Sequence, residues 1–325
     1  MRSAMTRRKL AVHGPVVDLE CAVPELEVAV ESMLGCFAVP GWPEGFVPIN
    51  GSIQPYDQAQ VTRHLSATAR HLMRVDDLLD IYEEGERYWL ADDRWGMCEL
   101  NLLRGSWRSW ILPAPRLDAV AIIEQAILFP LAQLIRSRGV YLLPSVSVVR
   151  DGFASLILSP FSVEPELMTL ATAGYRLIGQ RWTAIREEDG RLALLHMPGR
   201  VERSITPRLR SSSLVGDENE IAIPQLQVAS QNHAFCDAVL VAEPGRRPKA
   251  HVREVSQSEA IHLMRDAWPI IELHPSRRQS PLPGRLAQCC QIAQLQLSRN
   301  PKDLLSLLNS LRYSNSDDQQ RVAAA

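Results

Sequence analysis

The turn at 159–167, with the sequence SPFSVEPEL, lies where a phosphate-binding loop would do its chemistry. An apolar run at 156–158 precedes the turn and a helical pattern follows it as far as Gly174, which is the layout of a nucleotide-binding unit. Such a loop needs glycines, whose N–H groups curl around the anion, and a lysine that holds the outer phosphates. The turn contains neither residue type, and Pro160 and Pro165 remove two N–H donors.

Acidic side chains stand at the start of the helix that follows the turn. Glu164 and Glu166 suit the positive end of a helix dipole, but they compete with a phosphate for the same N–H donors. The turn is therefore open to three interpretations: a plain connection in which Ser162 caps the helix, a ligand or peptide pocket with a new use, or a working nucleotide site.

Arginines and a histidine form a second set of candidate groups beyond this turn. Arg181 lies just past an apolar strand at 175–178, at the end where open α/β sheets bind ligands. The other candidate ligand contacts are Arg176, His196, Arg200 and Arg203. Arginine binds phosphate and carboxylate groups bidentately. A solvated, charged loop explains the same residues without any ligand.

The segment 116–205 resembles the HPr kinase/phosphorylase family, in particular its kinase-like relatives in bacterial peptide-modification and exosortase loci. The long helix, the paired strands and the segment TAGYRLIGQRW at 172–182 carry the resemblance. It extends over nearly the whole chain and is most specific within 116–205. It implies an α/β fold, namely a PEP-carboxykinase-like or HPr-kinase-like P-loop domain with a mixed central sheet, preceded by a small α+β domain.

The departures from this family fall on its functional positions. The family's histidine aligns with Pro144, and its paired aspartates align with Gln180 and Arg181, neither of which accepts a proton near neutral pH. The glycine-rich loop aligns with a degenerate phosphate loop made of Ser159, Pro160, Phe161, Ser162, Val163 and Glu164. The resemblance thus implies a member that has lost its anion cradle, its cation and its base, so we assign no catalytic residue.

Composition limits the partners of this chain. The net charge of −2 provides no basic field for nucleic acid, and the lysines are confined to Lys9, Lys249 and Lys302. Six scattered cysteines without a C-x-x-C pair indicate free thiols in a reducing cytoplasm. His233 and Cys236 have a metal-like spacing but supply two ligands where structural zinc takes four. We therefore expect no metal, no cofactor and no membrane segment.

Patterning along the chain predicts three parts. We expect a small α+β domain at 1–114, an HPr-kinase-like domain at 115–313 and a disordered tail at 314–325. A long helix at 115–138, kinked at Pro130 and ended by Gly139, opens the second domain. The remaining main expectations are strands at 16–21 and 140–149, a hairpin at 78–91, and helices at 24–37, 285–298 and 302–312.

The leading functional hypothesis is a catalytically inactive, cytoplasmic protein that binds a peptide or protein in a bacterial peptide-maturation pathway. One alternative is an atypical phosphotransferase, or another transferase, that binds phosphate through arginines. A second alternative is a structural subunit of a homo-oligomer. Four tryptophans, Trp89, Trp95, Trp107 and Trp110, gather in the predicted N-terminal strands. We expect them to pack in the core, whereas an exposed subset would mark a binding face.

Overall fold

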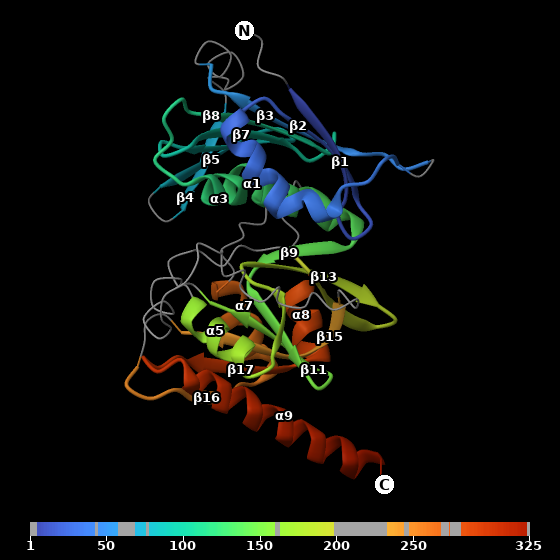
Figure 1. Cartoon of the computed structure of the whole chain (residues 1–325), viewed down its shortest axis with the longest axis vertical. Helices are drawn as coiled ribbons and strands as arrows, with labels where there is room; N and C mark the ends of the chain where they lie inside the picture. Colours follow the sequence, from blue (N-terminus) through green and yellow to red (C-terminus); the bar gives the residue numbers. More distant parts are fainter. Residues whose placement is uncertain are drawn as a thin grey trace, which may run out of the picture. The chain divides into compact units, whose positions relative to one another are not determined.

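The chain folds as two compact units, formed by residues 1–142 with 270–280 and by residues 143–269 with 281–325 (Figure 1). The computed structural model describes residues 5–42, 45–57, 69–75, 78–159, 163–197, 233–243, 247–267, 273 and 281–323. The boundary lies between Leu142 and Leu143 and not at 114/115, because the long helix packs on the first sheet. Leu273 returns to this helix, where its N–H donates to Gln133 Oε1 at 3.3 Å.

Unit 1 is built on an eight-stranded mixed sheet in the order β1-β2-β3-β8-β7-β6-β5-β4. Its strands are β1 (Thr6–Ala11), β2 (Val16–Cys21), β3 (Ile49–Pro55), β4 (Arg70–Val75), β5 (Leu79–Glu84), β6 (Arg87–Asp92), β7 (Gly96–Asn101) and β8 (Ser106–Ile111). The pairs β2–β3 and β3–β8 are parallel, and the remaining pairs are antiparallel. The predicted strand at 16–21 and the predicted hairpin at 78–91 are confirmed as β2 and as β5 with β6.

The described helices of unit 1 lie on one face of this sheet, and the opposite face is here called the open face (Figure 1). They are α1 (Pro24–Leu34), the short η1 (Gly35–Phe37), and a continuous helix formed by α3 (Ala119–Ile123), η2 (Glu124–Leu128), α4 (Phe129–Ile135) and η3 (Arg136–Arg138). The helix at 119–138 has the length and apolar composition of a membrane span, with a mean hydropathy of 1.5. The protein buries 61% of its apolar window, as expected for a core helix.

Pro130 is accommodated by a π-turn rather than by a break in the helix. Segment η2 is a π-helix, in which the Phe129 N–H donates to the Glu124 carbonyl five residues earlier. Pro130 has no N–H, so the Ala126 carbonyl lacks its α-helical donor. Two side chains of β8 replace that donor: Ser109 Oγ at 2.7 Å and Trp107 Nε1 at 3.1 Å. The helix is thereby fixed to the central strands of the sheet.

Trp107 also sets the residue type on the neighbouring strand. A Cβ atom on Gly51 of β3 would lie 2.2 Å from two carbons of the Trp107 ring. Trp89, Trp95, Trp107 and Trp110 are 0%, 1%, 3% and 0% exposed, which confirms that these tryptophans pack in the core. The contact between Gly51 and Trp107 keeps β3 and β8 closely paired beneath the open face.

Substituting Gly51 tests this packing. We expect Gly51→Ala to lower the free energy of unfolding by about 1–3 kcal/mol, because the added methyl forces the Trp107 ring off its position. Gly41→Ala is the control, since a Cβ there meets nothing within 4 Å. Urea unfolding followed by tryptophan fluorescence reports mainly on unit 1, where five of the seven tryptophans lie. Equal stabilities of the two variants would contradict the packing argument.

Unit 2 is built on a second mixed sheet of nine strands. Seven follow the order β12-β10-β11-β15-β14-β13-β9, and β17 pairs with both β15 and β16. The strands are β9 (Val140–Pro144), β10 (Val146–Arg150), β11 (Phe153–Leu158), β12 (Arg176–Gly179), β13 (Trp182–Glu188), β14 (Arg191–Leu195), β15 (His233–Ala242), β16 (His251–Glu254) and β17 (Gln291–Gln296). Its helices are α5 (Glu164–Thr172), α7 (Gln257–Ala267), α8 (Leu282–Cys289) and α9 (Lys302–Ala323). The expected α/β class with mixed sheets is confirmed.

Three expectations for secondary structure differ from this fold. The run at 285–298 is not one helix: α8 ends at Cys289 and β17 follows, where Ile292 and Leu295 are buried between partly exposed glutamines. The strand expected at 140–149 divides into β9 and β10 after Pro144. The helix expected at 302–312 is confirmed, but α9 continues to Ala323, where we expected a disordered tail from 314.

Candidate functional site

The strand–turn–helix unit singled out in the sequence stands at an edge of the unit 2 sheet. Strand β11 is parallel to β15, and β15 is parallel to β17, so the carboxyl ends of these strands lie at one edge. Ser159 follows β11 and Glu243 follows β15 there. Gln296, at the end of β17, donates from Nε2 to Glu243 Oε2 at 2.7 Å. The described residues at this edge therefore include a carboxylate, Glu243, that is held by Gln296.

Helix α5 begins without a side-chain cap. Its N-cap is Val163, which is buried and makes no side-chain cap bond. The expected cap at Ser162 is therefore not the observed N-cap; Pro160, Phe161 and Ser162 lie outside the described residues. Glu166 in the first turn is 1% exposed. A buried carboxylate so close to the start of the helix disfavours a bound phosphate.

The structure brings together two places that the sequence resemblance aligned with functional positions, Pro144 and the pair Gln180 and Arg181. The N–H of Ser145, the residue after Pro144, donates to the Arg181 carbonyl at 2.9 Å. Gln180 Oε1 is buried and has no hydrogen-bond partner among the described groups. Neither Gln180 nor Arg181 accepts a proton near neutral pH, so this place has no general base from those two residues.

The arginines proposed as ligand contacts do not converge in the part of the chain that the structure describes. Arg176 begins β12 and Arg181 follows its end, so a strand of about 3.3 Å per residue separates them. His196 Nδ1 lies 2.7 Å from the Ile178 carbonyl, which gives this ring a structural partner. Arg200 and Arg203 lie outside the described residues. The arginine-based transferase stays a hypothesis without a described site.

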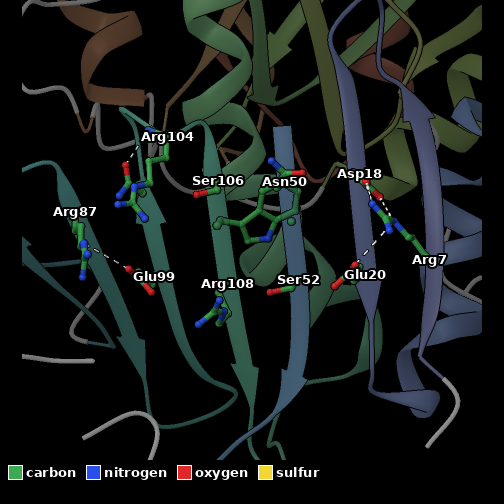
Figure 2. Close-up of a pocket in the computed structure, with 13 residues that line it drawn as sticks. Arg7, Asp18, Glu20, Asn50, Ser52, Arg87, Glu99, Arg104, Ser106 and Arg108 are labelled. Atoms are coloured by element: carbon green, nitrogen blue, oxygen red, sulfur yellow. Dashed lines mark hydrogen bonds and ion pairs between the residues drawn. The ribbon is translucent and has the colours of Figure 1, made fainter. Parts of the chain in front are cut away.

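A polar hollow of about 380 Å³ lies on the open face of the unit 1 sheet (Figure 2). We define it by its lining residues: Arg7, Asp18, Glu20, Asn50, Gly51, Ser52, Arg87, Glu99, Asn101, Arg104, Ser106, Trp107 and Arg108. Its volume falls in the range of about 300–1,000 Å³ that is typical of small-ligand sites. No sequence pattern had singled out this place.

Side-chain length across four strands produces the hollow. The cross-strand row Asp18, Asn50, Ser106 and Asn101 lies on β2, β3, β8 and β7. The next row on the same face is Glu20, Ser52, Arg108 and Glu99. Short side chains therefore occupy most of the two central strands and longer charged ones stand on the flanks. With strands about 4.8 Å apart, the walls on β2 and β7 are separated by about 14 Å.

The carboxylates of the hollow are paired with flanking arginines. Arg7 Nε donates to Asp18 Oδ1 at 2.8 Å, and a second bond joins Arg7 Nη2 to Asp18 Oδ2. Arg7 also lies 3.9 Å from Glu20, and Arg87 lies 3.7 Å from Glu99. The bond from Arg7 lowers the pKa of the buried Asp18 carboxyl against the opposing effect of its burial. Asp18 is therefore ionised throughout the neutral range.

The two remaining arginines, Arg104 and Arg108, have no such carboxylate partner among the described residues. Among the described residues, the recorded bond of Arg104 is from its backbone N–H to Asn101 Oδ1 at 2.9 Å. Arg108 Nε is buried without a hydrogen-bond partner, and its guanidinium lies 5.8 Å from the centre of the Trp110 ring. Four arginines against three carboxylates leave the hollow with one net positive charge.

No cluster of three or more metal-ligating side chains occurs within the described ranges. The chemistry available in the hollow is therefore hydrogen bonding and charge pairing through amide, hydroxyl, carboxylate and guanidinium groups.

Comparison with known proteins finds a likeness among solved structures. No family model and no curated protein matches this sequence. Among solved structures, the HPr(Ser) kinase/phosphatase from Coxiella burnetii is similar over 54% of this chain and 98% of its own, at 14% identity and a TM-score of 0.28. A likeness at this TM-score carries no argument about the site, so the functional interpretation below stands on the residues and their geometry.

The ion pair between Arg7 and Asp18 should make the stability of the protein depend on pH. The folded-state pKa of Asp18 is lowered, so the pair stabilises the protein above the unfolded pKa of about 3.9 and this contribution is lost as pH falls through the folded value. We expect Asp18→Asn to reduce the free energy of unfolding at pH 7 and to converge with the unsubstituted protein towards pH 3. Urea unfolding between pH 3 and pH 7 measures this; a difference that stays constant with pH would contradict it.

Proposed function

We propose that this chain is a non-catalytic binding protein whose ligand is a peptide or protein segment, bound in the polar hollow on the open face of unit 1. The observation that carries the proposal is the hollow itself, a cavity of about 380 Å³ lined by hydrogen-bonding side chains and by two guanidinium groups that have no ion pair among the described residues. Peptides present alternating N–H, carbonyl and charged groups, which match such a lining. The walls, about 14 Å apart on β2 and β7, leave room for one extended chain.

Unit 2 supports the non-catalytic part of the proposal. Its β11–α5–β12 segment and the residues TAGYRLIGQRW support a degenerate HPr-kinase-like domain. Phosphoryl transfer depends on positioned cations and a base. The turn after β11 contains neither glycine nor lysine, and Gln180 and Arg181 replace the family's aspartates. We propose that this unit serves as a scaffold and that the peptide-maturation setting of the related proteins applies to this chain.

Nucleotide binding tests the loss of phosphoryl chemistry. We expect no binding of ATP with Mg²⁺ up to millimolar concentration in calorimetric titration of the full chain, because the turn after β11 has no glycine and no lysine and Glu166 is buried in the first turn of α5. Hydrolysis of ATP should stay at the rate of the buffer blank. Micromolar binding, or turnover above that blank, would contradict a non-catalytic role.

Peptide selection tests the binding site. We expect phage-displayed random dodecapeptides selected on the full chain to yield sequences whose affinity falls at least tenfold in Ser52→Arg, which fills the hollow from its floor. Gln54→Arg is the matched control, since Gln54 lies on the same strand and face but does not line the hollow. A selection that yields no binder, or equal affinities in the two variants, would refute this site.

A further inference from the structure

The polar hollow contains two guanidinium groups that its own carboxylates do not neutralise. Glu99 and Arg108 are direct cross-strand neighbours on β7 and β8. Within the described chain, the recorded ion pair of Glu99 is nevertheless with Arg87, at 3.7 Å. Arg104, on the turn between the same two strands, is exposed and has no ion pair in the described residues. Figure 2 shows Arg104 near the turn that joins β7 and β8 and Arg108 farther along β8, past Ser106. Neither arginine has an ion pair with another described residue.

Arg108 is held in place by its surroundings rather than by an ion pair. The neighbouring residues Trp107 and Ser109 turn to the helix side, so Arg108 projects from the open face. Its guanidinium carbon lies 5.8 Å from the centre of the Trp110 ring, and Trp110 stacks on Trp89 with ring centres 6.2 Å apart. A guanidinium resting on an aromatic ring retains its N–H edges for a bidentate acceptor.

The floor beside Arg108 offers hydroxyl and amide groups. Asn50, Ser52 and Ser106 line the hollow, and no hydrogen bond joins their side chains to another group in the described residues. Ser52 is the direct cross-strand neighbour of Arg108, and Ser106 is that of Asn50. An acceptor bound to Arg108 is thus within the reach of further neutral donors on the adjoining strand.

These observations deepen the proposed function, on which the next step rests. We infer that the hollow binds its peptide through one carboxylate, gripped by Arg108 with Arg104 as the second cation. The carboxylates Glu20 and Glu99 on the flanks repel a polyanion, so nucleotides and nucleic acid are disfavoured. The same flanking carboxylates accept N–H groups from the peptide backbone. A peptide with an isolated acidic group satisfies both parts of the lining.

The experiment uses the full chain and the dodecapeptides selected on it, displayed through either end so that side-chain and C-terminal carboxylates are distinguished. We expect enrichment of Asp and Glu if the carboxylate belongs to a side chain, or binders only with a free C-terminus if it is terminal. Replacing that one carboxylate by its amide should weaken binding at least tenfold, since hydrogen bonds between charged groups are the stronger ones.

Protein variants assign the carboxylate to its cation. Arg108→Gln should lower the affinity for the acidic peptide at least tenfold and leave the affinity for its amide analogue unchanged. Arg108→Lys should lower the affinity for the acidic peptide less than Arg108→Gln does, because lysine keeps the charge but loses the bidentate geometry. Arg116→Gln is the control, with the same charge change on an exposed residue outside the hollow. Circular dichroism confirms that each variant is folded.

The outcomes separate this inference from the proposed function. Binders without an acidic preference that are still blocked by Ser52→Arg would overturn the carboxylate inference and leave the proposed function standing. An acidic preference that Arg108→Gln does not alter would also overturn the inference. The absence of any peptide binder would overturn the proposed function and the inference with it.

Discussion

A carbonyl group that lost its helical donor organises unit 1. Pro130 removes the N–H that Ala126 would receive in an α-helix, and the π-turn at 124–128 lets the chain continue. A buried carbonyl without a hydrogen-bond donor lowers the free energy of unfolding by about 1–3 kcal/mol. Trp107 and Ser109 of β8 each donate one hydrogen bond to the Ala126 carbonyl. In the sequence, Pro130 predicts a kink in the helix. In the fold, it leaves the Ala126 carbonyl to accept the two hydrogen bonds that join the helix to β8.

The hydrogen bonds from Trp107 and Ser109 to the helix also determine which residues of β8 lie on the open face. Because Trp107 and Ser109 turn towards the helix, the residues between and before them, Arg108 and Ser106, turn towards the open face. The Trp107 ring requires glycine at position 51, and Asn50 and Ser52 on either side of it complete the floor of the hollow. The core packing and the proposed binding surface are therefore on opposite faces of the same pair of strands, β3 and β8.

Sequence reasoning predicted most of the elements but placed the site elsewhere. The period of the long helix and the alternation at 16–21 are local, and the structure confirms them. The prediction of one helix at 285–298 was wrong because the glutamines and apolar residues there fit both a helix and a strand. Parallel pairing with β15, which comes from a distant part of the chain, selects the strand.

The polar hollow was missed for a related reason. Its two rows come from four strands that are not consecutive, so their alignment depends on the register of parallel pairs that no local signal sets. Polar residues alternate in each strand, as in Asn50 and Ser52 or Ser106 and Arg108, but alternation alone predicts only a solvated face. The positions that the family resemblance brought forward, Pro144 with Gln180 and Arg181, do lie together, and they lack a base.

The central claim is that ligand binding has its place on the open face of unit 1 and not at the strand edge of unit 2. A crystal structure of the full chain with a selected peptide tests this most directly. The account predicts peptide density over β3 and β8, with a carboxylate within hydrogen-bond distance of the Arg108 guanidinium. Density for peptide or nucleotide against residues 159–166, with the hollow filled by solvent, would contradict it.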